Sequence, residues 1–283
     1  MSERRDLVTE MTARGVSERA ACRAVGLRRS SQRYQPRDKG ERRRLAREVV
    51  VLAQQHPRYG YRRSTALLRR RGEHVNHKRV WAIWTAERLS LPRRRPRKRR
   101  RGPARADRPT TATHRNHVWT YDFLFDRTEH GQTLKILAVL DEYTRECHAL
   151  RVGRRLDSEA VLDTLAGLFR RQGAPAYLRS DNGGEFIAAR LRIWLARQGT
   201  ATVHIEPGHP WENGYAESFN GKFRDECLNT EAFWHERHAQ VVVERWRRHY
   251  NEERPHSGLG YRTPTEVAAT APAGAVGEAA ALA

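Results

Sequence analysis

The spacing of hydrophobic residues changes near residue 116 of this 283-residue chain. Before that point apolar residues recur every three or four positions, which predicts amphipathic helices. After it, alternating stretches predict strands over 118–123, 134–140, 147–152, 176–179 and 202–205. Further helical patterns lie over 157–172, 185–198, 212–228 and 236–250. Three consecutive strands followed by alternating helices and strands predict an α/β domain, with a mixed sheet flanked by helices.

The first 36 residues predict short helices joined by a tight turn. Ser17 is a suitable N-cap for a helix over 18–25, Gly26 supplies the turn, and the pattern over 28–34 predicts a second helix. This order is typical of a helix-turn-helix DNA-binding segment. Its candidate DNA contacts are Arg28, Arg29 and Arg33. An ordinary helical hairpin with a solvated basic face is the alternative interpretation.

A second all-helical module is predicted over residues 41–92, with a helix-turn-helix-like pair of helices at 62–71 and 76–89. Trp81 and Trp84 stand three apart on the second of these helices, and we expect both in the core rather than stacked on bases. The candidate DNA contacts of this pair are Arg62, Arg63, Lys78 and Arg79.

Positive charge is concentrated in the N-terminal part of the chain. Residues 1–110 hold 33 Lys and Arg against 10 Asp and Glu, whereas the remaining residues hold 21 against 23. This asymmetry indicates a basic arm that binds a polyanion, joined to a near-neutral globular body. Nucleic acid is the favoured polyanion, because phosphate contacts dominate its affinity for proteins. A membrane is disfavoured, because no basic amphipathic helix carries a large apolar face.

The densest charge lies in a linker predicted over residues 93–110. Residues 93–101 are basic at eight of nine positions and include a proline, a composition that does not fold alone. We expect this linker to lie along a phosphate backbone through Arg97, Lys98 and Arg99, with a solvated spacer as the alternative. The Ala-rich residues 269–283 predict a flexible tail.

The cysteine content and the hydropathy favour a cytoplasmic protein. Cys22, Cys147 and Cys227 are odd in number and far apart, which fits reduced thiols better than a disulfide framework. No apolar run approaches the roughly 20 residues of a membrane span, and the charged N-terminus lacks the apolar core of a signal peptide.

Three carboxylates carry the candidate chemistry. Asp122 is expected to close the first strand, Asp181 to follow the fourth, and Glu217 to lie within the 212–228 helix, with 35 residues between the second and the third. Two strand-end carboxylates and one from a facing helix can converge, and such hard oxygen ligands suit Mg²⁺ or Mn²⁺. Two ions about 4 Å apart would activate a water or a 3′-hydroxyl for in-line displacement at phosphorus. Asp141 also ends a strand, and we favour a structural role for it in a turn.

The sequence around these carboxylates resembles a known family. SDNGGEF contains Asp181, and ENGYAESFNGKFRDECLN contains Glu217. Further matches are HPRYGYRR at 56–63, VNHKRVW at 75–81 and HYNEERPHSGLGYRTPTE at 249–266. Over nearly its whole length the chain resembles the DDE integrase core of the retroviral-integrase-like superfamily, most closely the OrfB type of bacterial insertion-sequence transposase. It lacks the cysteines for the His-His-Cys-Cys zinc site of retroviral integrases.

The resemblance implies a ribonuclease-H-like core over residues 111–268, with Asp122, Asp181 and Glu217 as catalytic metal ligands. It also implies a DNA contact seven residues beyond the glutamate, at Arg224. The expected partners are the terminal inverted repeats of a mobile element and a target DNA, bound in the nucleoid. Since two DNA ends must meet, a homo-oligomer on DNA is expected, and an upstream (OrfA-type) reading frame is a candidate partner or fusion.

Several interpretations stay open at the level of the residues. Lys222 and Arg224 are expected to face DNA, and Asn213 either approaches DNA or starts the helix. One alternative function is a nuclease of the same fold that cuts DNA without joining it. Another is a DNA-binding regulator or inactive transposase fragment with no catalysis.

Overall fold

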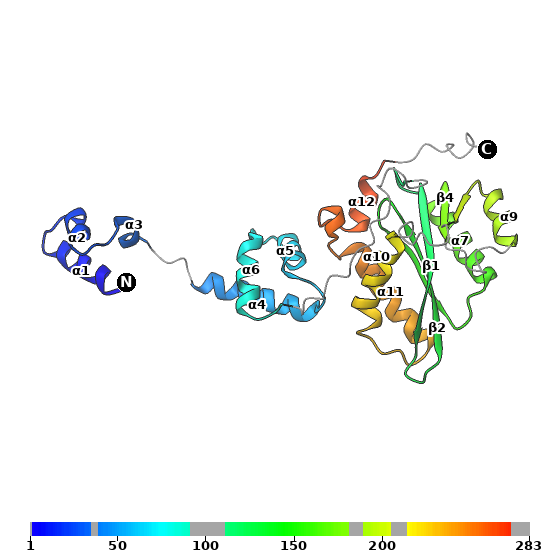
Figure 1. The fold of residues 1–283 in the computed structure, drawn as a ribbon, viewed down its shortest axis with the longest axis horizontal. Helices are drawn as coiled ribbons and strands as arrows, with labels where there is room; N and C mark the ends of the chain where they lie inside the picture. Colours follow the sequence, from blue (N-terminus) through cyan, green and yellow to red (C-terminus); the bar gives the residue numbers. More distant parts are fainter. Residues whose placement is uncertain (1, 35–38, 91–110, 181–188, 205–213, 273–283) are drawn as a thin grey trace. The chain divides into compact units, whose positions relative to one another are not determined.

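The computed structural model describes residues 2–34, 39–90, 111–180, 189–204 and 214–272. The chain forms two compact units, residues 1–55 and residues 56–283. The first unit is all-helical (Figure 1). Its helices are α1 (Ser2–Ala13), α2 (Glu18–Ala24), α3 (Arg29–Gln32) and α4 (Lys39–Gln55).

The predicted N-terminal turn is present, but its second helix is short. The Ser17 hydroxyl accepts from the amide of Ala20 at 3.4 Å and caps α2, and Gly26 adopts a left-handed φ of +67° in the turn. The helix expected over 28–34 covers only residues 29–32. Ser30 and Ser31 occupy its middle, and serine favours local hydrogen bonds over helix propagation.

The second unit is built on a five-stranded mixed sheet in the order β3-β2-β1-β4-β5 (Figure 1). β1 (Val118–Arg127), β2 (Thr133–Asp141) and β3 (Cys147–Gly153) form an antiparallel meander. β4 (Tyr177–Ser180) runs parallel to β1, and β5 (Ala201–His204) runs parallel to β4. This is the predicted α/β architecture with a mixed sheet.

Helices cover both faces of this sheet. On one face Trp119 and Tyr121 of β1 belong to a buried cluster with α7 (Ser158–Gln172) and α9 (Ala189–Arg197). On the other face Leu124 belongs to a cluster with α10 (Gly214–Phe223) and α11 (Glu236–Glu252). Because successive strand residues point to opposite faces, Asp122 lies on the same face as Leu124, towards α10.

The β1–β2 hairpin is longer than the sequence pattern indicated. Pairing continues from Trp119 opposite Asp141 to Arg127 opposite Thr133. Asp122, which we expected at the end of the first strand, therefore lies in the middle of β1, opposite Ala138. The predicted strand ended too early, since residues 118–121 are buried without interruption whereas Phe125 and Arg127 at the hairpin tip are exposed.

The helix predicted over 212–228 has two parts among the described residues. α10 begins at Gly214, and η3 (Arg224–Leu228) continues it as a single π-helical segment. Short π segments inside helices are frequent at functional sites. Residues 181–188 and 205–213 lie outside the described residues, and with them Asp181 and Asn213.

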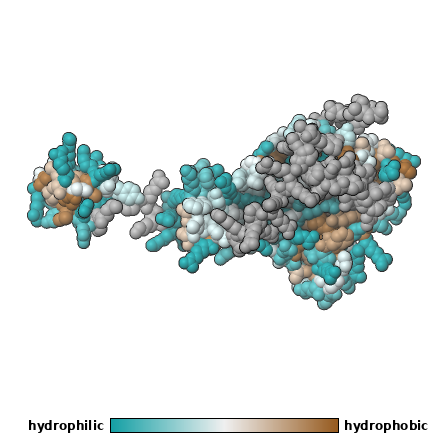
Figure 2. Space-filling model, in the orientation of Figure 1, coloured by the Kyte–Doolittle hydropathy of each residue, from teal (hydrophilic) through white to brown (hydrophobic). Residues whose placement is uncertain are grey.

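The module before the sheet contains α5 (Tyr61–Arg70) and α6 (His77–Ala86), which pack on each other. Val80, Ile83 and Trp84 are buried, but Trp81 is 54% exposed, so the prediction that both tryptophans lie in the core was wrong for Trp81. Residues 80, 83 and 84 share one helix face by their spacing, and Trp81 lies off that face. Figure 2 shows mainly hydrophilic residues on the drawn side of the α4–α6 segment.

The chain closes the second unit with η4 (Ser257–Leu259) and α12 (Pro264–Thr270), whose start is fixed by a capping box between Thr263 and Glu266. The three cysteines are unpaired and buried. In the part of the chain that the structure describes, no helix is both long and apolar enough to cross a membrane.

Candidate active site

A hydrogen bond joins β1 to α10 at the predicted site. The Asn220 side-chain amide of α10 donates to Oδ2 of Asp122 at 2.7 Å, and the backbone amide of Phe123 donates to Oδ1 at 2.8 Å. Asn220 lies three residues after Glu217, so both side chains project from neighbouring positions on the helix surface. The structure therefore brings Asp122 next to the helix that carries Glu217.

Glu217 lies in the first turn of α10 and is exposed. The opposite side of this helix is anchored in the core, where the Phe219 ring lies 5.0 Å from Tyr250 and the Phe223 ring lies 4.8 Å from Trp246. Because these aromatic contacts fix the rotation of α10 about its axis, the carboxylate of Glu217 is held on the accessible side.

Asp181 lies outside the described residues and directly follows Ser180, the last residue of β4. β4 is the parallel neighbour of β1, with Thr120 opposite Arg179. Among the described residues no three His, Cys, Asp or Glu side chains gather into a metal site. Asp122 and Glu217 nevertheless offer the hard carboxylate oxygens that suit a divalent cation such as Mg²⁺.

The β2–β3 turn is built around Asp141. Its Oδ1 accepts from the amides of Tyr143 and Thr144, both at 2.8 Å, and its Oδ2 accepts from the amide of Asn116 at 2.7 Å. Asp141 is fully buried, and three backbone donors occupy its carboxylate. The predicted structural role of Asp141 is confirmed.

Lys222 and Arg224, the predicted DNA contacts on this helix, have different surroundings. Lys222 is half-buried, and its ammonium donates to the Ser218 hydroxyl at 2.9 Å. Burial lowers the pKa of Lys222 to about 8, with help from the positive charges of Arg254 and Arg63. Arg224 is exposed and donates to the Phe125 carbonyl at 3.4 Å, which leaves most of its surface accessible to a phosphate.

The sequence analysis missed a buried ionic cluster, whose charges act on Lys222. Arg254 makes two hydrogen bonds of 2.6 Å to the carboxylate of Glu226 in η3, and Arg63 of α5 adds a third at 3.2 Å. The Tyr59 hydroxyl lies 2.9 Å from Nε2 of His249, and burial raises the pKa of that hydroxyl. These contacts attach the α5 module to the helices around the site. The charge of Arg63, a candidate DNA contact, is thus paired with the carboxylate of Glu226.

The remaining candidate DNA contacts lie mostly on the surface. Arg28, Arg62 and Lys78 are exposed, and Arg79 is half-buried. Arg29 and Arg33 both pair with the carboxylate of Glu18. The other candidates lie outside the described residues: Arg97, Lys98, Arg99 and Asn213.

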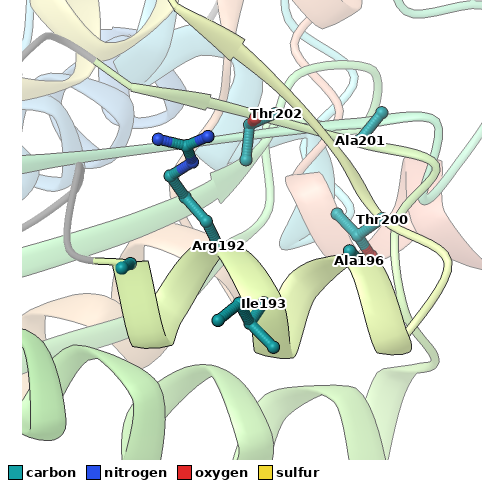
Figure 3. Close-up of a pocket in the computed structure, with 7 residues that line it drawn as sticks. Arg192, Ile193, Ala196, Thr200, Ala201 and Thr202 are labelled. Atoms are coloured by element: carbon teal, nitrogen blue, oxygen red, sulfur yellow. The ribbon is translucent and has the colours of Figure 1, made fainter.

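An open cavity of about 570 Å³ lies between α9 and β5, two strands away from β1 (Figure 3). Figure 3 shows Arg192 reaching from α9 towards Thr202 of β5, with Ile193 on the other side of the helix. The described residues that line this cavity include none of the predicted site residues. Asp122 and Glu217 lie elsewhere, on β1 and α10.

Comparison with known proteins defines the class of this chain. Two family models described as integrase core domain match residues 112–210 and 198–264, and a model described as HTH-like domain matches residues 41–97. The sheet with helices on both faces is thus the ribonuclease-H-like integrase core that the sequence predicted.

Individual relatives identify the family. An uncharacterized 31.7 kDa protein of insertion element IS407 from Burkholderia multivorans is 40% identical over 254 residues, which cover 90% of this chain and 91% of that protein. Transposase InsD of insertion element IS2 from Escherichia coli is 30% identical over 247 residues, covering 80% and 81%. The chain belongs to the family of insertion-element transposases, which are DNA-recombining proteins with an integrase core.

Among solved structures, the HTLV-2 integrase catalytic core domain in complex with magnesium is similar with a TM-score of 0.42 and 14% identity. The similarity covers 54% of this chain and 95% of that one. The fold assignment rests on the sheet topology and on the two integrase-core models.

Proposed function

We propose that this transposase is a DDE-type polynucleotidyl transferase in which Asp122, Asp181 and Glu217 bind the catalytic metal. The observation that carries the proposal is the hydrogen bond from Asn220 to Asp122, because it joins the β1 carboxylate to the helix that bears Glu217. Mg²⁺, or Mn²⁺ in its place, is the cofactor that three carboxylates suit best, and the proposed site takes two ions.

The residues around the site hold the carboxylates ready for this chemistry. When bound, the divalent cations would supply activation of water or of a DNA 3′-hydroxyl and stabilisation of the leaving oxygen. The two hydrogen bonds to Asp122 orient its carboxylate, as outer partners orient the ligands of other metal sites. No protein nucleophile is required, so the role of the chain is to position the DNA strand and to balance its charge.

DNA is the proposed partner, through the terminal inverted repeats of the element and a target duplex. Residues 56–90 carry nine Lys and Arg against two Asp and Glu, and the basic run at 93–101 follows them. Neutralising phosphates with such residues releases counterions and supplies affinity that falls with salt. Bringing two DNA ends together requires more than one copy, so we propose a homo-oligomer on DNA, with an upstream-frame partner or fusion as an additional component.

The test is Mg²⁺-dependent processing of a duplex that ends in the inverted repeat of the element. The wild-type chain is compared with Asp122→Asn, Asp181→Asn and Glu217→Gln, each with and without the upstream frame fused. Glu252→Gln is the matched control, since Glu252 is an exposed carboxylate on α11. We expect nicks at the repeat ends and joined products from wild type and control, and a loss of at least about 100-fold in the three site variants.

The products separate the proposed function from its alternatives. Nicked DNA without joined strands would indicate a nuclease of the same fold. Salt-dependent binding of the repeats with no cleavage, equal in all variants, would indicate a DNA-binding regulator or an inactive fragment and would overturn the proposal.

A further inference from the structure

The β2–β3 turn contacts β4, which precedes Asp181 in the sequence, and α10, which carries Glu217. Glu142 of this turn pairs with Arg179 of β4 at 3.3 Å, and both side chains are almost fully buried. Arg179 lies two residues before Asp181 in the sequence. At the other end of the turn, Arg145 contacts α10. One short turn thus connects β4 and α10.

The contact of Arg145 is a stacking interaction. Its guanidinium carbon lies 3.4 Å from the centre of the Tyr215 ring. Guanidinium groups stack favourably on aromatic rings at this distance, through both the cation–π attraction and the planar contact. Tyr215 lies two residues before Glu217, in the first turn of α10. The contact therefore acts on the part of the helix where the proposed ligand stands.

The other contacts described above anchor the middle and the end of α10. Phe219 and Phe223 anchor the middle and the end of the helix in the core, and Asn220 joins its middle to β1. Ala216 is buried in the first turn but offers only a methyl group. The Tyr215 ring is the large side chain of that turn, and Arg145 stacks on it.

The backbone of Arg145 supplies a second, independent observation. Arg145 has φ +66°, in the left-handed region that favours glycine, and its amide donates to the Asp141 carbonyl at 3.0 Å to close the turn. A residue with a side chain is strained in this conformation, and such strain concentrates at functional sites, where the side chain is needed. A glycine would close the same turn without strain but would remove the stack on the Tyr215 ring.

We propose that Arg145 is a positioning residue, which holds Glu217 in place by stacking on Tyr215 at the start of α10. This inference rests on the proposed function, because it assigns Arg145 a role towards the metal site. Arg145 does not touch the reacting atoms. It acts through α10, and it restricts the motion of the helix turn that bears the ligand.

The decisive variant is Arg145→Gly, which relieves the strained backbone and removes the stack together. A purely structural arginine would lose stability on replacement, whereas here we expect an unchanged or raised melting temperature. Amide hydrogen exchange in residues 214–220 of the metal-free protein should become faster. Binding of Mn²⁺, followed by electron paramagnetic resonance, should weaken about tenfold, and the cleavage rate at saturating DNA should fall by about 10- to 100-fold.

Two further variants isolate the stack, and one controls for strain. Tyr215→Phe keeps the ring and should behave as wild type, whereas Tyr215→Ala should reproduce the faster exchange and weaker Mn²⁺ binding of Arg145→Gly. Arg88→Gly is the matched control, because Arg88 is an exposed arginine with φ +55° after α6. It should change neither exchange in α10 nor Mn²⁺ binding.

The readouts distinguish failure of this inference from failure of the proposed function. If wild type neither binds Mn²⁺ nor cuts DNA, the proposed function falls and the role of Arg145 falls with it. If wild type does both, the inference is overturned by an Arg145→Gly variant whose α10 exchange, Mn²⁺ affinity and cleavage rate equal those of wild type. It is also overturned if Arg145→Gly and Arg88→Gly change these quantities equally.

Discussion

Replacing Glu226 with glutamine removes the carboxylate that Arg63 and Arg254 share in the buried ionic cluster. Arg254 is fully buried and makes both of its 2.6 Å hydrogen bonds to this carboxylate. Breaking a buried ion pair by removing one partner costs about 3–5 kcal/mol, because the remaining charge stays desolvated. Arg63 is 22% exposed and reaches solvent more easily, so Arg254 dominates the loss.

This loss is large enough to measure by unfolding. For a body of this size, a change of 1 kcal/mol moves the melting temperature by about 2–4 °C, so Glu226→Gln should lower it by roughly 6–20 °C. The urea midpoint should fall without a change in slope. Glu231→Gln is the control, since its partner Arg245 is 72% exposed at 3.5 Å and such a surface pair contributes at most about 1 kcal/mol.

A double variant tests the cause of the destabilisation. Converting the pair to Glu226→Met/Arg254→Met removes both buried charges, and apolar replacements of buried pairs are often neutral. The double variant should therefore be more stable than Glu226→Gln alone. Equal melting temperatures for Glu226→Gln and Glu231→Gln would show that the cluster is not desolvated and would refute the reasoning.

Three further outcomes are expected. Because Trp81 is exposed, Trp81→Ala should keep the melting temperature of the wild type but weaken binding to inverted-repeat DNA, measured by fluorescence anisotropy. Trp84 is buried, so Trp84→Ala should cost about 3–5 kcal/mol of stability. An unchanged DNA affinity of Trp81→Ala would exclude a contact between Trp81 and DNA. Burial, together with two nearby arginines, lowers the pKa of His148 to about 3 in the folded chain. Below the ordinary histidine pKa, His148 is therefore protonated in the unfolded chain but stays neutral in the folded chain. The contribution of His148 to the free energy of unfolding is complete above about pH 6.5 and falls by about 1.4 kcal/mol per pH unit below it. In His148→Phe the urea midpoint should therefore depend less on pH between about pH 6.5 and pH 4 than it does in wild type. Because the pKa of Lys222 is lowered to about 8, its ammonium loses its charge as pH rises through 8, and the DNA affinity of the wild type should fall. The affinity of Lys222→Arg should fall less, since arginine keeps its charge. Equal pH profiles for the two proteins would show that Lys222 does not contact DNA.

The elements of the sheet were predictable because burial on two faces leaves a periodic trace in the sequence. The meander and α7 follow that trace, and so do the positions of Asp122 and Glu217 on a strand and a helix. The trace ends where burial ends. The exposed tip of the β1–β2 hairpin and the exposed Trp81 are two places where the prediction was wrong.

The contacts around the candidate site leave no periodic pattern in the sequence. Arg63 and Glu226 are 163 residues apart, and a stack of Arg145 on Tyr215 joins a turn to a distant helix. No local spacing encodes these pairs, because they depend on how the sheet and helices meet. The left-handed backbone of Arg145 could not be predicted either. Glycine is the residue that normally indicates this conformation, and an arginine in an arginine-rich chain gives no such indication.

Two adjacent arginines show why residue type alone does not determine which side chains remain exposed. Both Arg62 and Arg63 stand in a basic helix, and both were candidates for phosphate contact. Neighbouring positions on a helix point about 100° apart, so α5 directs Arg62 to solvent and Arg63 to the carboxylate of Glu226. Arg63 therefore ties α5 to η3, the continuation of the helix with Glu217, and the exposed Arg62 stays available for DNA. One short helix thus joins the HTH-like module to the integrase core through Arg63 and keeps the charge of Arg62 exposed, where we expect it to contact DNA phosphates.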